Sequence, residues 1–184
     1  MGCSESTRGQ LLIAGPELAE PNFWRTVVLM VDHGDDGALG LVLNRPSDTT
    51  VGEAVPQLSD LADPTEDVMI GGPVQPSSVI VLAEFNEPEE AALISFDQIG
   101  VLASGSPLDE IGAGVTSVRV FAGHAGWGPG QLENELERGD WILEPATYDD
   151  AFAVDPRDLW KSVLSRKGGS YALVARMPVD PSTN

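Results

Sequence analysis

The sequence predicts an α+β fold in which a mostly antiparallel, bent sheet is flanked by helices. Short apolar runs of strand length follow one another, and turn sequences rather than long helices join most of them. Strands in hairpin order favour antiparallel pairing, because parallel neighbours need a long crossover between them. No repeat or linker divides the chain. Residues 1–184 are therefore predicted to form one domain, with flexible tails at 1–8 and 178–184.

The chain is globular in composition and strongly acidic. Hydrophobic residues make up 42% of it, and 10 Lys and Arg stand against 29 Asp and Glu, which gives a net charge of -19. No Lys or Arg lies between Pro46 and Val118, whereas half of the basic residues lie between Arg157 and Arg176. Such a chain repels nucleic acids and anionic membranes, so neither is an expected partner. A direct nucleic-acid contact could come only from the C-terminal basic cluster.

Cysteine usage and hydropathy predict a cytoplasmic protein. Cys3 is the only cysteine, so no internal disulfide can form, in agreement with a reducing compartment. Residues 1–10 lack the apolar segment of a signal peptide. No apolar run approaches the roughly 18 residues of a membrane span. We therefore expect neither export nor a membrane-spanning segment.

The first part of the chain predicts three strands, with a hairpin between the second and the third. The strands are expected at residues 10–14, 25–32 and 38–43. His33–Gly37 supplies the two glycines and two aspartates of a tight turn. Pro46 is expected to end the third strand, because proline cannot donate to a central ladder.

A short helix and a second group of strands follow. Thr50 can cap a helix over Val51–Leu58, with Glu53 as its capping partner and Pro56 limiting its length. Further segments follow in order: strands at 68–70, 79–85, 91–96 and 99–103, then a loop at 105–114 with one turn of helix at 108–111.

The last part combines two helices with short strands. Ser117–Ala122 is predicted to be a strand, and Gly128-Pro129 to start a helix that Gly139 ends. A helix from Asp155 to Lys167 carries one apolar stripe. The remaining segments are a strand at 140–143, an irregular stretch at 147–154 and a final strand at 171–177.

Three glycine-rich corners follow predicted strands, and they are the candidate binding regions. We call them the His33 corner (His33–Gly37 with Asn44-Arg45), the Gly71 corner (Gly71–Val74) and the Gly123 corner (Gly123–Glu133). Glycine lets a backbone approach another segment or a ligand closely. An arginine can clamp a carboxylate or phosphate, and a helix N-terminus can bind an anion. The candidate ligand-binding residues are His33, Asn44, Arg45, Gly71, Gly72, Gly123, His124, Trp127, Gln131 and Glu133.

No complete catalytic set is visible, so no catalytic residue, metal or cofactor is predicted. The sequence has no phosphate-binding loop, nucleophile elbow or zinc motif. His33 and His124 are the only histidines, and with Glu133 they could act as acid–base groups or metal ligands. Each candidate also has a structural explanation. The histidines can be hydrogen-bonded core residues, Trp127 can fill the core, and Gln131 can cap its helix.

The same corners resemble the YqgE/AlgH family of bacterial proteins, whose function is largely uncharacterised. The matching segments are Gly9–Ala14, Val31–His33, Gly37–Pro46, Gly71–Val74, Gly123–Glu133 and Trp141. The resemblance implies a bent, partly barrel-like sheet flanked by helices, in a cytosolic protein. One branch is linked by name to alginate synthesis as a transcriptional regulator. Asp32 stands where many members have glutamate, and position 124 is often tyrosine. The second departure counts against His124 as a base, since tyrosine cannot replace it near neutral pH.

These observations favour a non-enzymatic, regulatory module that binds a small ligand or a protein partner where the three corners meet. One alternative is a hydrolase or transferase that uses His33 and Glu133, with or without a metal. That reading requires the two side chains to lie within hydrogen-bond reach. Another alternative is a transcriptional regulator that acts by partner binding. The sequence leaves the ligand or partner unidentified.

Overall fold

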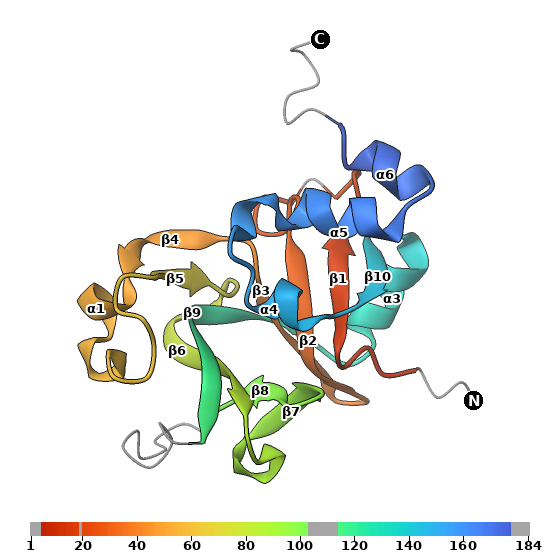
Figure 1. The fold of residues 1–184 in the computed structure, drawn as a ribbon. Coiled ribbons are helices and arrows are strands. Elements are labelled where there is room, and N and C mark those ends of the chain that lie inside the picture. The colour runs from red at the N-terminus through yellow and green to blue at the C-terminus, as the bar shows by residue number, and fades with distance from the viewer. Residues whose placement is uncertain (1–4, 19, 103–113, 178–184) are drawn as a thin grey trace.

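The structure is a computed structural model that describes residues 5–18, 20–102 and 114–177 (Figure 1). The predicted tail at 178–184 and the predicted helical turn at 108–111 lie outside these residues. The strands of the described part are β1 (Gln10–Ala14), β2 (Val27–Gly34), β3 (Gly37–Val42), β4 (Pro46–Thr50), β5 (Asp67–Ile70), β6 (Val74–Phe85), β7 (Leu93–Phe96), β8 (Ile99–Val101), β9 (Val115–Trp127) and β10 (Trp141–Pro145).

These strands form one bent, mostly antiparallel sheet, which confirms the predicted α+β class. Its order is β10-β1-β2-β3-β9-β6-β8-β7, and β4 and β5 attach beside β9. Among the described strands, only β5 and β9 pair in parallel. The helices are α1 (Val51–Ala54), α3 (Gln131–Arg138), α4 (Tyr148–Ala151), α5 (Leu159–Lys167) and α6 (Ser170–Val174), with 3-10 turns η1 (Pro56–Leu58), η2 (Pro88–Glu90) and η3 (Pro156–Asp158).

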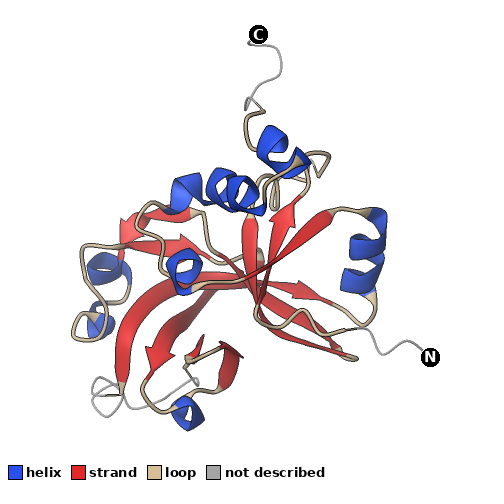
Figure 2. Cartoon of the chain, turned by 45° about the vertical axis from the view of Figure 1, so that its right-hand side comes forward, coloured by secondary structure: helices blue, strands red, loops and turns tan. Residues whose placement is uncertain are grey.

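Helices cover both faces of the sheet around β1 and β2 (Figure 2). Alternate side chains of a strand point to opposite faces, and β1 buries both sets. Leu11 and Ile13 join a core cluster with Val163 of α5. Leu12 joins a second cluster with Leu132 of α3. The run of four buried apolar residues from Leu11 to Ala14 is therefore explained by the place of β1 between two helical layers.

A third apolar cluster lies at the far end of the sheet, under α1 and η1. Val68, Val81 and Val120, from three neighbouring strands, pack there against Val51 of α1. The predicted capping box is confirmed, because Thr50 and Glu53 exchange side-chain to backbone hydrogen bonds. The predicted helix over 51–58 is interrupted, and residues 56–58 form a separate 3-10 turn. Pro56 lacks the N–H that would continue the first helix.

The long strand β9 belongs to both halves of the sheet. It pairs with β6 along one edge and with β5 and β3 along the other. The prediction that this strand ends at Ala122 is wrong, since it continues through the glycines to Trp127. Gly123 has φ +74, and a Cβ added to it would lie 2.5 Å from the Gly72 carbonyl oxygen. The glycines therefore let β9 pass close to another backbone instead of ending the strand.

Three further segments differ from their predictions. The expected strand at 171–177 is helix α6, because Tyr171, Val174 and Ala175 contact the core at helical spacing. The irregular stretch at 147–154 contains α4, which Thr147 caps. Pro46 begins β4 instead of ending the strands, and proline is tolerated there because β4 pairs only with β5.

The sheet bends far enough for its edge strand β7 to return to β2. The Ser95 hydroxyl donates a 2.7 Å hydrogen bond to the Met30 carbonyl oxygen, and Ser95 is buried. Among the described strands no ladder joins β7 to β2, so the sheet stays open. None of the helices in the described ranges is long and apolar enough to cross a membrane.

We expect Gly72→Ala to destabilise the protein by about 3 kcal/mol or more in urea unfolding. Gly72 has φ +153, and a Cβ there would lie 2.2 Å from the carbonyl carbon and oxygen of His124. Gly126→Ala in β9 is the control, because its new Cβ would make only an ordinary 3.7 Å contact with Val74. Equal losses in the two variants would show that the backbone crossing is not the constraint.

Candidate functional site

The three corners meet, but packed backbone fills the places where they touch. A Cβ on Gly71 would lie 2.3 Å from the Gly123 carbonyl oxygen, and one on Gly37 would lie 2.2 Å from that of Trp127. The Val42 N–H donates a 2.8 Å hydrogen bond to the Gly71 carbonyl oxygen. These glycines therefore hold chain segments together, which leaves the side chains around them as the candidates for binding.

His33 and Glu133 lie within hydrogen-bond reach, 2.8 Å apart from Nε2 to Oε1. On its other side, His33 Nδ1 accepts the Thr7 backbone N–H at 3.0 Å. Because a backbone N–H can only donate, Nδ1 is the acceptor and Nε2 carries the hydrogen that Glu133 accepts. The His33 side chain is 3% exposed. It thus ties the N-terminal segment to β2 and α3.

Thr7, which lies within the tail predicted at residues 1–8, is a site residue that sequence reasoning missed. Thr7 is buried, and its hydroxyl lies 3.1 Å from His33 Nδ1. A single threonine in a polar terminal segment carries no periodic or motif signal. Only the fold brings it to the end of β2.

Glu133 lies in the first turn of α3, as the sequence predicts for an acidic residue at a helix start. The hydrogen bond from its own backbone N–H, followed by that from His33, lowers the pKa of its carboxyl group. The group is therefore held as a carboxylate, which suits a hydrogen-bond acceptor for the His33 ring.

Trp127 belongs to an aromatic cluster centred on Glu135, which sequence reasoning also missed. The indole N–H groups of Trp127 and Trp141 both donate to Glu135 Oε2, each at 2.8 Å. Gln131 donates to the other oxygen at 3.2 Å, and its own Oε1 accepts the Gly128 N–H as a capping partner. The rings of Trp127 and Trp141 lie 6.2 Å apart, edge to face. The spacing of Gln131 and Glu135, four residues apart on one helix, is the signal that could have found this cluster.

His124 is separate from the His33–Glu133 pair. It lies in β9 opposite Val74, and no hydrogen bond joins it to His33 or Glu133 among the described residues. Its Nδ1 is buried without a partner there, and burial lowers the pKa of the ring. The two histidines therefore do not form one site. The described residues also contain no group of three His, Cys, Asp or Glu side chains placed to hold a metal ion.

Asn44 and Arg45 fix the loop that precedes β2. Asn44 accepts the Val27 N–H and donates to the Arg25 carbonyl oxygen. Arg45 donates to three carbonyl oxygens, those of Pro21, Asn22 and Trp24. Burial lowers the pKa of Arg45, with Glu20 acting against this shift. Both side chains thus hold the backbone of this loop in place through hydrogen bonds.

This loop forms one wall of a pocket of about 330 Å³, which we call the Arg45 pocket. Its lining residues are Trp24, Arg25, Asn44, Arg45, Arg157, Asp158, Trp160 and Lys161. The Arg25 guanidinium lies 5.0 Å from the ring centre of Trp24 and 4.6 Å from that of Trp160. From this set, sequence reasoning named Asn44 and Arg45 as ligand-binding candidates, and it named Arg157 only as part of the C-terminal basic cluster. The four-residue spacing of Arg157 and Lys161 was the available signal for one shared basic face.

We expect Glu135→Ala to lower the free energy of unfolding by about 2–4 kcal/mol, because it leaves two indole N–H groups unpaired in the core. Trp127 and Trp141 are 6% and 5% exposed, so water reaches them poorly. Glu135→Gln keeps an acceptor oxygen and is expected to lose less than about 1.5 kcal/mol. Urea unfolding followed by tryptophan fluorescence measures both. A Glu135→Ala protein as stable as the Gln variant would contradict this role.

His124 is expected to make the protein less stable in mild acid. Its pKa is lowered from the usual 6.5 in the folded chain, so the unfolded chain binds a proton first as the pH falls. The stability present above pH 6.5 is then lost progressively as the pH falls towards the folded pKa. His124→Tyr, which does not titrate in this range, should lose less stability over the same interval. Parallel pH profiles of the two proteins would refute the effect.

Comparison with known proteins places the chain in a family. Residues 11–172 match the AlgH-like family model (DUF179). A UPF0301 protein of Streptomyces coelicolor is 41% identical over 185 residues, which cover 97% of this chain and 96% of that relative. A UPF0301 protein of Mycobacterium avium is 41% identical over 96% of this chain and 90% of its own length.

Two solved structures share the fold over nearly the whole chain. The crystal structure of DIP2367 from Corynebacterium diphtheriae has a TM-score of 0.83 and 30% identity, and covers 96% of this chain and 95% of its own. The solution structure of AlgH from Pseudomonas aeruginosa has a TM-score of 0.73 and 30% identity, with 98% of both chains covered. The resemblance inferred from the three corners is thus confirmed, and the chain belongs to the AlgH-like family.

Proposed function

We propose that this protein is a non-enzymatic, regulatory module that binds a small ligand in the Arg45 pocket. One observation carries the proposal: four cationic side chains line one pocket in a chain of net charge -19. Like charges repel one another, so gathering them is unfavourable unless an anion or a carboxylate offsets them. Asp158 is the only carboxylate among the lining residues.

The walls of the pocket are held before any ligand arrives. Arg45 fastens the loop at 21–24 through three carbonyl oxygens, and Asn44 fastens the chain at Arg25 and Val27. A preformed wall loses little conformational entropy on binding. In this proposal Asn44 and Arg45 hold the pocket wall in its shape, and other lining side chains contact the ligand.

The alternative of a hydrolase or transferase is favoured by the chain of contacts from Thr7 through His33 to Glu133. A hydroxyl, a histidine and a carboxylate in series resemble a nucleophile with its base and orienting acid. Two features count against it. The Thr7 hydroxyl is buried, and the Thr7 N–H already occupies the Nδ1 lone pair that a base would need. We therefore assign this set a structural role.

A regulator that acts by partner binding is compatible with the same pocket, which would then sense the ligand. The net charge of -19 disfavours direct contact with DNA. Such a regulator would act in the cytoplasm through a protein partner.

The proposal is tested by capturing metabolites on the purified full-length protein and identifying them by mass spectrometry. We expect one small anionic compound to be retained with its mass unchanged. Trp24→Ala should retain at least about tenfold less, which corresponds to 1.4 kcal/mol. Tyr148→Ala, which removes a similarly exposed aromatic ring outside the pocket, is the control. Lys161→Glu replaces Trp24→Ala should the latter unfold.

Two outcomes would overturn the proposal. The first is conversion of the retained compound to a product, with the conversion lost in Glu133→Gln, which would favour the hydrolase or transferase. The second is equal retention by wild type, Trp24→Ala and Lys161→Glu, which would place the ligand elsewhere.

A further inference from the structure

The Arg45 pocket divides into two fixed cations and two that are available to a ligand. The Arg45 guanidinium donates to backbone carbonyl oxygens. The Arg25 guanidinium lies against two tryptophan rings and donates to the Met177 carbonyl oxygen. Arg157 and Lys161 differ. Both are exposed, and neither makes a hydrogen bond or ion pair within the described part of the chain.

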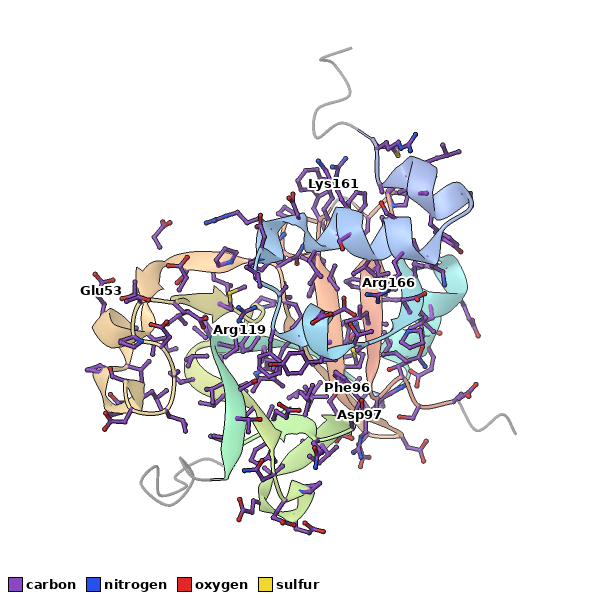
Figure 3. All side chains as sticks on the ribbon, in the orientation of Figure 1. Glu53, Phe96, Asp97, Arg119, Lys161 and Arg166 are labelled. Atoms are coloured by element: carbon purple, nitrogen blue, oxygen red, sulfur yellow. The ribbon has the colours of Figure 1, made fainter. Side chains whose placement is uncertain are left out.

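The two available cations line the same pocket. Arg157 lies in the 3-10 turn η3, and Lys161 lies in the first turn of α5, which follows directly. Figure 3 labels Lys161 on the side of α5 turned away from the sheet. A guanidinium fork and an ammonium group that line one pocket can hold one compact anionic group, the first in a bidentate manner and the second as a point charge.

From this arrangement we infer that the Arg45 pocket binds a small phosphate monoester whose organic part carries hydroxyl groups, such as a sugar phosphate or a nucleoside monophosphate. The inference rests on the proposed function and names its ligand class. A phosphate monoester carries a charge of about -1.5 to -2 at neutral pH and three strong acceptor oxygens. Such a group matches Arg157 and Lys161 better than a monocarboxylate, which offers one charge and two oxygens.

The volume of the pocket indicates how large the organic part of the ligand can be. A volume of about 330 Å³ lies at the lower end of the range for small-molecule sites, roughly 300–1,000 Å³. A phosphate ion alone would leave most of it empty, so the pocket has space for a sugar or a sugar with a base. Trp24 is 38% exposed on its rim and offers an apolar surface for that part.

Asp158 and the charge of the whole chain limit the ligand to a single phosphate group. The Asp158 carboxylate lines the same pocket without a side-chain hydrogen bond in the described part, so it can accept bonds from hydroxyl groups. It would repel a second phosphate at that position. The net charge of -19 acts in the same direction on polyanions, because every further phosphate outside the pocket meets an acidic surface.

The test is calorimetric titration of the full-length protein at constant ionic strength with four probes: inorganic phosphate, ribose 5-phosphate, adenosine 5′-monophosphate and succinate. We expect at least one of the two esters to bind at least about tenfold more tightly than phosphate or succinate. Arg157→Gln/Lys161→Gln should weaken ester binding by about tenfold or more. Neither residue has a partner to lose, so this variant should melt close to wild type.

The matched control is Arg8→Gln/Arg138→Gln. It removes the same two charges from exposed ion pairs with Asp32 and Asp140, outside the pocket. This control should bind the ester as wild type does. Equal loss in both double variants would mean that only overall charge is sensed, and the inference would be wrong.

The remaining outcomes separate this inference from the proposed function. Succinate binding as tightly as the esters, with loss in Arg157→Gln/Lys161→Gln, would overturn the phosphate assignment and leave the pocket as the binding site. Ester binding that the double variant does not weaken would place the site elsewhere and overturn both. The absence of binding by all four probes would overturn the phosphate assignment, and the metabolite capture would then decide on the pocket itself.

Discussion

The close passage of two backbones at Gly71–Gly72 and Gly123–His124 is the constraint on which the rest of this structure depends. The strand β9 can pair with β6 on one side and with β5 and β3 on the other only if these chains approach without side chains between them. Because β9 belongs to both halves of the sheet, this crossing fixes the position of one half, with the helices packed on it, relative to the other. Glycine has no Cβ and tolerates positive φ, so no other residue serves here at comparable cost. A concentration of glycines that resembles a ligand-binding loop is thus explained by the assembly of the sheet.

The polar residues of the candidate sites fall into two groups with different physical roles. Thr7 and His33 are buried and hydrogen-bonded to each other, the partly exposed Glu133 accepts the second hydrogen bond of the ring, and Glu135 accepts from two indole N–H groups. Buried polar groups that are fully paired stabilise a single arrangement of the chain, whereas unpaired ones are costly. The second group, Arg157 and Lys161, is exposed and lacks partners within the described part. Chemistry directed at a ligand is more readily supplied by the second group, because it has donors left to give.

The sequence was a good guide where a local rule decides the outcome and a poor one where distant packing does. The hairpin after His33, the capping box at Thr50 and the helix before Gly168 follow from turn, cap and stripe patterns. The strand prediction for 171–177 is wrong because the apolar residues of this segment fit the spacing of a strand as well as that of a helix. Contact of the segment with the core favours the helix. The pairing of His33 with Glu133 was anticipated as a condition of one hypothesis. Asn44 and Arg45 are predicted as ligand-binding residues, but Thr7 and the joining of Asn44 and Arg45 with Trp24, Trp160 and Lys161 in one pocket depend on contacts between distant parts of the chain, which no local pattern encodes.

The uneven distribution of acidic and basic residues has a consequence for the binding of anions. With 29 acidic residues against 10 basic ones, most of the surface repels anions. Four of those basic residues line one pocket beside the carboxylate of Asp158, so its lining side chains carry a local excess of positive charge. Screening limits such a field to roughly 8–10 Å at physiological salt, so a small anion is attracted only once it reaches the mouth of the pocket. A long polyanion would gain the same attraction over one segment and meet repulsion over the remainder. Under the proposed function, this charge distribution would select a ligand by size as well as by sign, which a uniformly basic surface could not do.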